Sequence, residues 1–224
     1  MSVLTLLCVS CAEKSYFIDG NSTQFSLNGG MAYIREFSSV TTKQSIDSCE
    51  VLHGHFQMSG PLDSTMLVSL SMGDDAFIPV VLENGDISID IANTSIKIAG
   101  TPLNEKLYAF LASRDSLVYL ITDIPRSQAY LFMQGFSPFE IQDELFKKQS
   151  EYTNALDKLE TEFIKDNYDN VLGVTWFMDL CRRTQMHYGI PVMTPQIKGI
   201  YDSAPKKFRK DYRVASYIDA IRSY

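Results

Sequence analysis

The feature that most constrains the fold of this chain is a change of hydrophobic period near residue 100. From Ser15 to about Gly100, apolar residues recur at every second position between short turn-forming segments. After Pro102 they recur three or four positions apart, as Leu103 and Leu107 do. A period of two is typical of strands, and a period near 3.6 is typical of helices. The sequence therefore predicts an all-β antiparallel sandwich followed by an α-helical region, rather than alternating βαβ units.

Turn signals divide the first part into short strands. Asn28-Gly29-Gly30, His53-Gly54 and Asn84-Gly85 each lie between apolar runs, and their residues tolerate the positive φ that tight turns need. We therefore predict hairpins at His53-Gly54 and at Asn84-Gly85. Short strands at this spacing, without helical pattern between them, are typical of a sandwich. The predicted strands include residues 31–37, 46–52, 55–59, 66–72, 77–82, 87–91 and 96–98.

Proline and small polar residues set the predicted helix limits in the second part. Pro125 ends the first helix, and Ser137-Pro138 begins the next in the favoured way, with Ser as N-cap and Pro at the first helical position. Later helices are predicted over residues 171–186, from Thr194-Pro195 and over residues 211–224. The predicted buried stripe of the second helix is Ile141, Leu145, Tyr152, Leu156, Leu159 and Phe163. The predicted parts are a leader and linker at 1–14, a sandwich at 15–101 and a helical region at 102–224.

The first eleven residues predict that the protein is anchored to a membrane. An apolar run from Val3 to Val9 is followed by Ser10 and Cys11. This order resembles the lipobox of bacterial lipoproteins, in which the Cys is diacylated, and two acyl chains anchor a protein stably. The leader departs from that pattern because it has no Lys or Arg before the run and has Cys8 where Leu is usual. We expect lipidation of Cys11 and a lipid-anchored place in the bacterial cell envelope, facing the periplasm or the surface.

Other roles for the cysteines stay open. Cys8 and Cys11 have the spacing of a thioredoxin-type redox pair, but that chemistry needs a preceding strand and a helix start, which this segment lacks. A frayed N-terminal strand is the plainer alternative to lipidation. Cys49 and Cys181 lie far apart in sequence, and either a disulfide or two buried free thiols fits them.

Composition narrows the class of partner. The 224 residues carry a net charge of −7, with 20 Lys and Arg against 27 Asp and Glu, which argues against nucleic acid as a partner. The one dense basic cluster, residues 206–213, is interpreted as the exposed face of a helix. No stretch approaches the about 18–20 apolar residues that span a bilayer.

Catalytic and metal-binding patterns are weak in this sequence. His53 and His55 could share one face of a strand, but Gly54 marks a turn and no third ligand is near. His187 follows an apolar helix and is interpreted as a C-terminal capping side chain. We find no serine elbow and no phosphate-binding glycine loop. The sequence therefore predicts no enzyme activity, no cofactor and no metal.

A series of short motifs carries a family resemblance. They are Ile46-Asp47-Ser48, Gly54-His55-Phe56, Gly60, Leu82-Glu83-Asn84-Gly85-Asp86-Ile87, Gly100-Thr101 and Asn104. Their order resembles a domain-of-unknown-function family found N-terminal to thioredoxin-like domains of the AhpC/TSA type in envelope thiol:disulfide interchange lipoproteins. The resemblance spans roughly residues 15–110, and the second domain with its C-x-x-C pair has no counterpart here. It implies the accessory domain without the oxidoreductase.

Two functions follow as expectations. The first is a non-enzymatic envelope lipoprotein that acts as a binding or interaction module of unknown ligand. The alternative is an accessory part of a thiol:disulfide interchange system, which docks substrates for a thioredoxin-like or other envelope partner.

Overall fold

The computed structural model describes residues 14–24, 27–36, 45–72 and 76–223. Cys8 and Cys11, and with them the predicted lipidation site, lie outside the described residues. The chain forms two compact units that divide between Glu105 and Lys106, whereas the sequence placed the boundary between residues 101 and 102.

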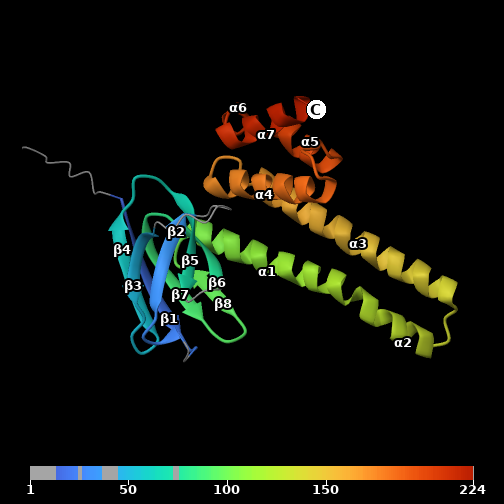
Figure 1. Ribbon diagram of the computed structural model, residues 1–224, viewed down its shortest axis with the longest axis horizontal. Helices are drawn as coiled ribbons and strands as arrows, with labels where there is room; N and C mark the ends of the chain where they lie inside the picture. Colours follow the sequence, from blue (N-terminus) through green and yellow to red (C-terminus); the bar gives the residue numbers. More distant parts are fainter. Residues whose placement is uncertain (1–13, 25–26, 37–44, 73–75, 224) are drawn as a thin grey trace, which may run out of the picture. The chain divides into compact units, whose positions relative to one another are not determined.

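The first unit is a β-sandwich, as predicted (Figure 1). One sheet has the strand order β4-β1-β7-β8, and the other has the order β3-β2-β5-β6. Branched and aromatic side chains at alternate positions fill the space between the sheets, as Tyr16 and Ile18 do in β1. The strands are β1 (Ser15–Ser22), β2 (Met31–Glu36), β3 (Ser45–Glu50), β4 (His55–Pro61), β5 (Met66–Met72), β6 (Ala76–Leu82), β7 (Gly85–Ile91) and β8 (Ile96–Ala99).

One sheet is mixed rather than antiparallel. β1 pairs antiparallel with β4 but parallel with β7, in a register that runs from Tyr16 beside Gly85 to Ser22 beside Ile91. Parallel neighbours cannot be joined by a tight turn and need a long crossover, which here passes through the other sheet. The sequence could not indicate this pairing, because local turn signals carry no information about strands so far apart.

The turn at His53-Gly54 forms, but the hairpin predicted there is wrong. Only Leu52 and His55 pair across the turn, and the strands on either side of it do not pair with each other. Both turn residues have positive φ, 53° and 81°, and Leu52 and His55 exchange N–H···O bonds of 2.9 Å. β3 then pairs with β2 and β4 pairs with β1, so the turn carries the chain from one sheet to the other. A Cβ on Gly54 would lie 2.4 Å from the Ser22 carbonyl oxygen, which explains the glycine.

The hairpin predicted at Asn84-Gly85 is also wrong. β6 and β7 belong to different sheets, so this connection again crosses the sandwich. The Asn84 side chain bonds to a distant segment: its Oδ1 accepts from the backbone N–H of Ser15 at 3.0 Å. β7 instead pairs antiparallel with the strand that follows it, β8.

The second unit is helical, as predicted, with one helix that the sequence did not reveal, α2. The basic cluster at residues 206–213, interpreted as the exposed face of one helix, is divided between α6 and the start of α7. Phe110, Phe163 and Trp176 pack as an aromatic cluster, with the Phe110 and Phe163 rings stacked at 3.8 Å. None of the described helices is long and apolar enough to cross a membrane. The elements are α1 (Pro102–Asp123), η2 (Ile124–Arg126), α2 (Ser127–Met133), α3 (Pro138–Lys165), α4 (Val171–Tyr188), α5 (Pro195–Ser203), α6 (Lys206–Arg209) and α7 (Tyr212–Arg222).

Residues 106–165, from α1 through α3, form a two-stranded helical arm. α3 runs back alongside α1 and α2, and α4 and α5 pack against the other end of α3 (Figure 1). Of the predicted buried stripe of α3 only Ile141 is buried, and the other five side chains are partly exposed. The reason is that a two-helix arm covers each helix from one side only.

Candidate functional site

The described cysteines are poor candidates for redox chemistry. Cys49 in β3 and Cys181 in α4 are free thiols, so the disulfide that the sequence left open is not formed in the structure. Burial raises the pKa of both thiols above their ordinary value, and Cys181 is fully enclosed in the helical core. A reactive thiol needs a lowered pKa, because the thiolate is the nucleophile.

The histidines have local roles. The backbone N–H of His53 donates to the Asn28 Oδ1 at 2.6 Å. This bond joins the turn between the two sheets to the connection between β1 and β2. Among the residues that the structure describes, no group of three His, Cys, Asp or Glu could hold a metal ion. His187 stacks edge-on against Tyr188, and Gly189, with φ of 77°, ends α4.

The later motifs of the family resemblance form one buried network. The Asn104 side chain accepts from the Val81 N–H at 2.9 Å and donates to the Val81 carbonyl at 2.8 Å, as a neighbouring strand would. It also donates to the Thr101 hydroxyl, at 2.9 Å. The Glu83 Oε1 accepts from the N–H groups of Leu103 and Asn104. This network attaches the first turn of α1 to the edge strand β6, so these residues are structural.

The earlier motifs serve the pairing of β1 with β4. Phe56 lies over Gly20, where a Cβ would come within 2.0 Å of the ring. Tyr16 likewise lies over Gly60, and its hydroxyl donates to the Asp47 Oδ2 at 2.9 Å. An aromatic ring over a glycine on the neighbouring strand fills space that the glycine leaves empty. These motif residues are therefore also structural.

A buried charge cluster, which the sequence did not reveal, holds three helices together. Glu160 of α3 is 1% exposed and accepts from Arg114 of α1 at 3.0 Å and from Arg183 of α4 at 2.7 Å. Arg183 also bonds Asp179, one turn earlier on its own helix. Both carboxylate oxygens of Glu160 accept from these arginines, and burial keeps the group from contact with a ligand in solution.

The distal end of the helical arm is closed by two capping motifs. Gly135, with φ of 88°, ends α2, and the Phe136 N–H returns to the Leu131 carbonyl at 3.2 Å. Ser137 is the N-cap of α3, as predicted, and it also forms a capping box with Glu140. Leu131 and Ile141 are buried between the two helices. The turn is thus built with defined geometry rather than as a loose loop.

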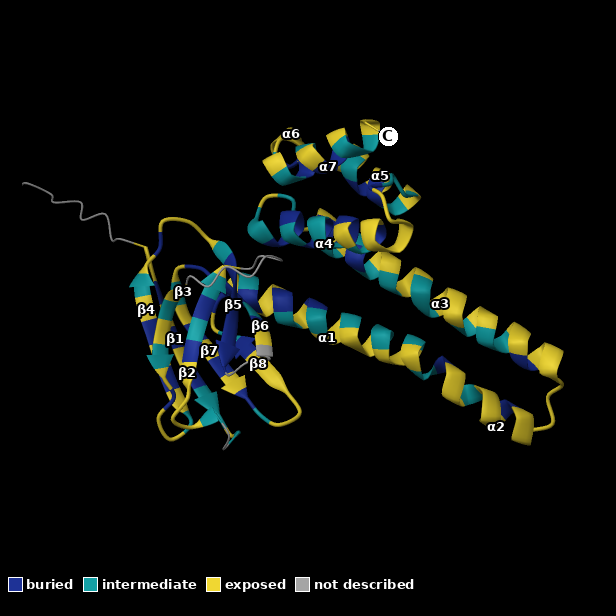
Figure 2. Ribbon diagram, viewed as in Figure 1, coloured by how far each residue is buried: buried dark blue, intermediate teal, exposed yellow. Residues whose placement is uncertain are grey.

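Five large apolar side chains around this turn are exposed, and we call them the apolar tip. Their exposed fractions are 59% for Tyr130, 68% for Phe132, 78% for Met133, 36% for Phe136 and 81% for Phe139. Figure 2 shows α2 and the start of α3 almost wholly in the colour of exposed residues. With about 150–250 Å² for a whole aromatic side chain, the tip exposes roughly 600 Å². That is at the upper end of the largest apolar patch of a typical monomer, about 300–600 Å².

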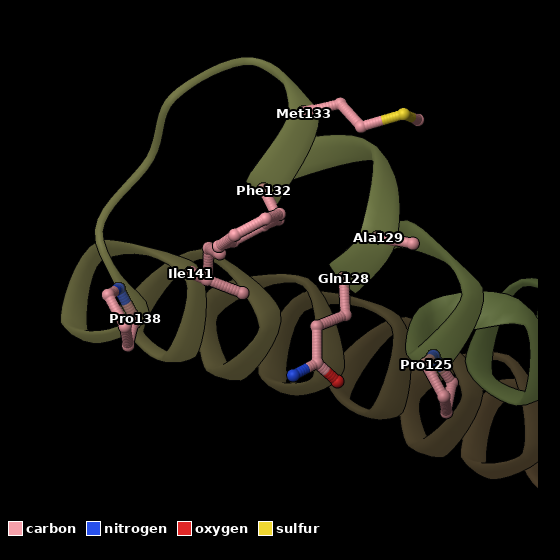
Figure 3. Close-up of a pocket in the computed structure, with 7 residues that line it drawn as sticks. All are labelled: Pro125, Gln128, Ala129, Phe132, Met133, Pro138 and Ile141. Atoms are coloured by element: carbon pink, nitrogen blue, oxygen red, sulfur yellow. The ribbon is translucent and has the colours of Figure 1, made fainter.

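A hollow of about 540 Å³ opens beside the tip. Figure 3 shows Phe132 turned toward Ile141 across the hollow and Met133 turned away from it. Gln128 supplies a polar group in an otherwise apolar lining. The lining residues are Pro125, Gln128, Ala129, Phe132, Met133, Pro138 and Ile141. An apolar concavity with few polar groups is typical of binding sites.

The hydrophobic period of the sequence does not predict this site, although the composition of residues 127–139 carries a signal for it. Residues 127–139 contain no charged residue, while they contain three Phe, one Tyr and one Met. Connections between helices are normally polar, so an uncharged aromatic connection is the signal that pointed here.

Fold and site together define a β-sandwich domain that carries a helical arm with an exposed apolar end. Residues 16–107 match the family model described as Domain of unknown function (DUF4369). The match covers the sandwich and the start of α1, and it bears out the resemblance of the sequence motifs to a domain-of-unknown-function family. The match ends within α1 and does not reach the apolar tip. No curated protein matches the chain.

Proposed function

We propose that this protein is a membrane-anchored, non-enzymatic interaction module that binds its partner through the apolar tip. The observation that carries the proposal is the exposure of five large apolar side chains, between 36% and 81%, on a turn with two defined caps. Exposing such a patch to water is unfavourable, and the largest apolar patch on a monomer is often a functional one.

The polar residues support binding rather than catalysis. Glu83 and Asn104 join a helix to a strand, and Glu160 joins three helices. The two described thiols have raised pKa values, which makes them weak nucleophiles. These groups are therefore occupied with folding, whereas Met133 and Phe139 of the apolar tip, 78% and 81% exposed, contribute little to the packing of the arm.

The anchor of the module is the proposed lipid on Cys11. Metabolic labelling with a palmitate analogue should mark the wild-type chain and leave Cys11→Ser unlabelled. Label that persists in Cys11→Ser would show that Cys11 does not carry the anchor.

Binding through the tip is tested by photo-crosslinking in cells that produce the full chain. A photoreactive residue replaces Met133 in one strain and Lys158, an exposed residue on the same arm, in the control strain. We expect adducts from position 133, with either protein or lipid, and none from position 158. Equal yields at the two positions, or none at position 133, contradict the proposed site.

The second candidate function is the accessory role in thiol:disulfide interchange. The match of residues 16–107 to the family supports it, because the motifs of that segment resemble domains that precede thioredoxin-like domains. An insulin-reduction assay on the isolated chain tests the no-enzyme part of both proposals. Turnover that depends on Cys8 and Cys11 would show an oxidoreductase.

A further inference from the structure

We propose that the partner of the apolar tip is the interfacial layer of a lipid bilayer, into which the tip inserts independently of any acyl anchor. This rests on the proposed function, in which the tip is the binding site, and adds the chemistry of the partner.

The exposed side chains surround α2 instead of forming one face. Successive helical residues are about 100° apart, and Leu131 faces α3, where it is buried. Tyr130 and Phe132 therefore lie to either side of it, and Met133 lies on the far side. A flat partner surface covers one of these directions, whereas a bilayer into which the tip inserts surrounds all of them.

α3 contributes to the tip in the same way. Phe139 lies about 200° around the helix from the buried Ile141, so it faces away from α2. The roughly 600 Å² exposed by the tip is also less than the about 800 Å² that each partner contributes to a standard protein interface. Direction and area both favour a lipid surface over a second copy of this chain.

The charges are placed as insertion requires. Residues 127–139 carry none, and the flanking charges Arg126 and Glu140 begin on either side of that segment. Arg126 bonds Asp123 at 3.1 Å, and Glu140 accepts from the Ser137 N–H at 2.8 Å. These groups fall at the level of polar headgroups when the uncharged turn is inserted, with the amphipathic Tyr130 between the two layers.

The flanking charges nearly cancel, so they predict how binding should depend on lipid composition. Over residues 123–148 there are four acids and three bases, a net charge of −1: Asp123, Glu140, Asp143 and Glu144 against Arg126, Lys147 and Lys148. Binding should therefore be driven by apolar burial, with little preference for anionic lipids and little dependence on salt.

Depth supplies a matched control on the same helix. Phe146 is 72% exposed, similar to Phe139, but lies seven residues further along α3. At about 1.5 Å per residue it lies about 10 Å behind Phe139, beyond the about 5–10 Å to which interfacial segments insert. In the other unit, Phe77 of β6 is 67% exposed and serves as a second control.

The experiment measures flotation of the full chain with vesicles of phosphatidylcholine alone and of phosphatidylcholine with one quarter phosphatidylglycerol. All proteins carry Cys11→Ser, so that no acyl chain contributes. We expect both vesicles to bind the chain with partition coefficients within about threefold of each other. Met133→Ser with Phe139→Ser should lower partitioning by about tenfold or more. Phe146→Ser and Phe77→Ser should each change it by less than about twofold.

A second readout does not depend on removing side chains. Phe136→Trp should become protected and be quenched by brominated acyl chains when vesicles are added, while Trp176, only 9% exposed, supplies a constant background. Because Met133 and Phe139 pack little, the serine variants should keep the melting temperature of the parent chain.

Each other outcome overturns the lipid proposal in a recognisable way. Absence of partitioning into both vesicles, or equal loss in Phe77→Ser, shows that the tip does not insert. A concentration-dependent dimer that Met133→Ser and Phe139→Ser abolish, without vesicle binding, makes a second copy the partner. Crosslinks from position 133 to a protein alone would likewise keep the tip as a binding site and reject the bilayer. If position 133 gives no adduct of any kind, the proposed function itself fails.

Discussion

At the scale of single residues, Tyr16 shows how one polar group is placed in an apolar core. Its side chain is 4% exposed, and its ring lies over Gly60 while its hydroxyl bonds Asp47 of the opposite sheet. Burial, together with the bond to the Asp47 carboxylate and its charge, raises the pKa of Tyr16 above the ordinary value for tyrosine. The neutral side chain is thus part of the folded state.

Stability should therefore fall in alkaline solution. An unfolded tyrosine titrates near pH 10, and the folded one titrates higher, so above about pH 10 the unfolded chain releases the proton first. The free energy of unfolding then decreases as pH rises. In Tyr16→Phe, the free energy of unfolding should decrease less steeply above pH 10. At pH 7 it should be about 1 kcal/mol lower than in the wild type, because the hydrogen bond is lost. Urea unfolding across pH 7–11 measures both effects.

The control for that series is Tyr119→Phe, because the Tyr119 side chain is 61% exposed. Its unfolding curve should follow that of the wild type at every pH. If Tyr16→Phe keeps the full alkaline slope, Tyr16 is not a source of it. Burial also raises the pKa of Tyr108, so part of the slope should remain in the variant.

At the scale of elements, Glu160 connects α1, α3 and α4 through two arginines. The period of α3 places this residue beside its apolar stripe, and a single charged residue there would be read as a solvent-facing one. Arg114 and Arg183 come from helices that precede and follow α3, so the arginines meet Glu160 only after the helices pack. A buried carboxylate is tolerated here because both of its oxygens are bonded.

Glu160→Gln should destabilise the helical unit. It leaves two arginines without a buried counter-charge, and we expect a loss of roughly 2–3 kcal/mol in the free energy of unfolding, below the about 3–5 kcal/mol of a fully buried pair. The reduction reflects the partial exposure of Arg114 and Arg183, 25% and 35%. Glu162→Gln is the matched control, because Glu162 is exposed and lies 3.9 Å from Lys158. Denaturant unfolding measures the loss of unfolding free energy in both variants. Equal losses would show that the burial of Glu160 does not contribute to stability.

At the scale of the whole molecule, each unit has a core of its own. Ile18, Ile34 and Leu70 are fully buried in the sandwich, and Phe177 and Ile197 are fully buried in the helical unit. Such units can open separately when few interactions join their cores.

Hydrogen exchange of two variants tests this separation. Asn104→Ala leaves the buried Val81 N–H and carbonyl without partners and should cost about 2–3 kcal/mol. We expect faster exchange in the sandwich strands of Asn104→Ala and in α3 and α4 of Glu160→Gln, with the other unit unchanged in each case. If both variants accelerate exchange throughout the chain to the same extent, the two units unfold as one.

The sequence by itself determined what depends on local geometry. The change of period near residue 100 separated strands from helices, and Ser137-Pro138 and Thr194-Pro195 marked helix starts that the structure contains. Backbone preferences and the spacing of apolar residues act over a few positions, so they can be read from neighbouring residues. The same reasoning located the turns at His53-Gly54 and Asn84-Gly85.

Only the tertiary structure decided which segments meet and which apolar surfaces stay uncovered. Both turns connect different sheets, because strand pairing is settled by packing between segments far apart in the chain. The hydrophobic period indicates that a helix has an apolar side, but whether that side is buried depends on the segments that pack against it. For Leu131 that neighbour exists, and for Met133 and Phe139 the residues that the structure describes supply none, which leaves the apolar tip for a partner.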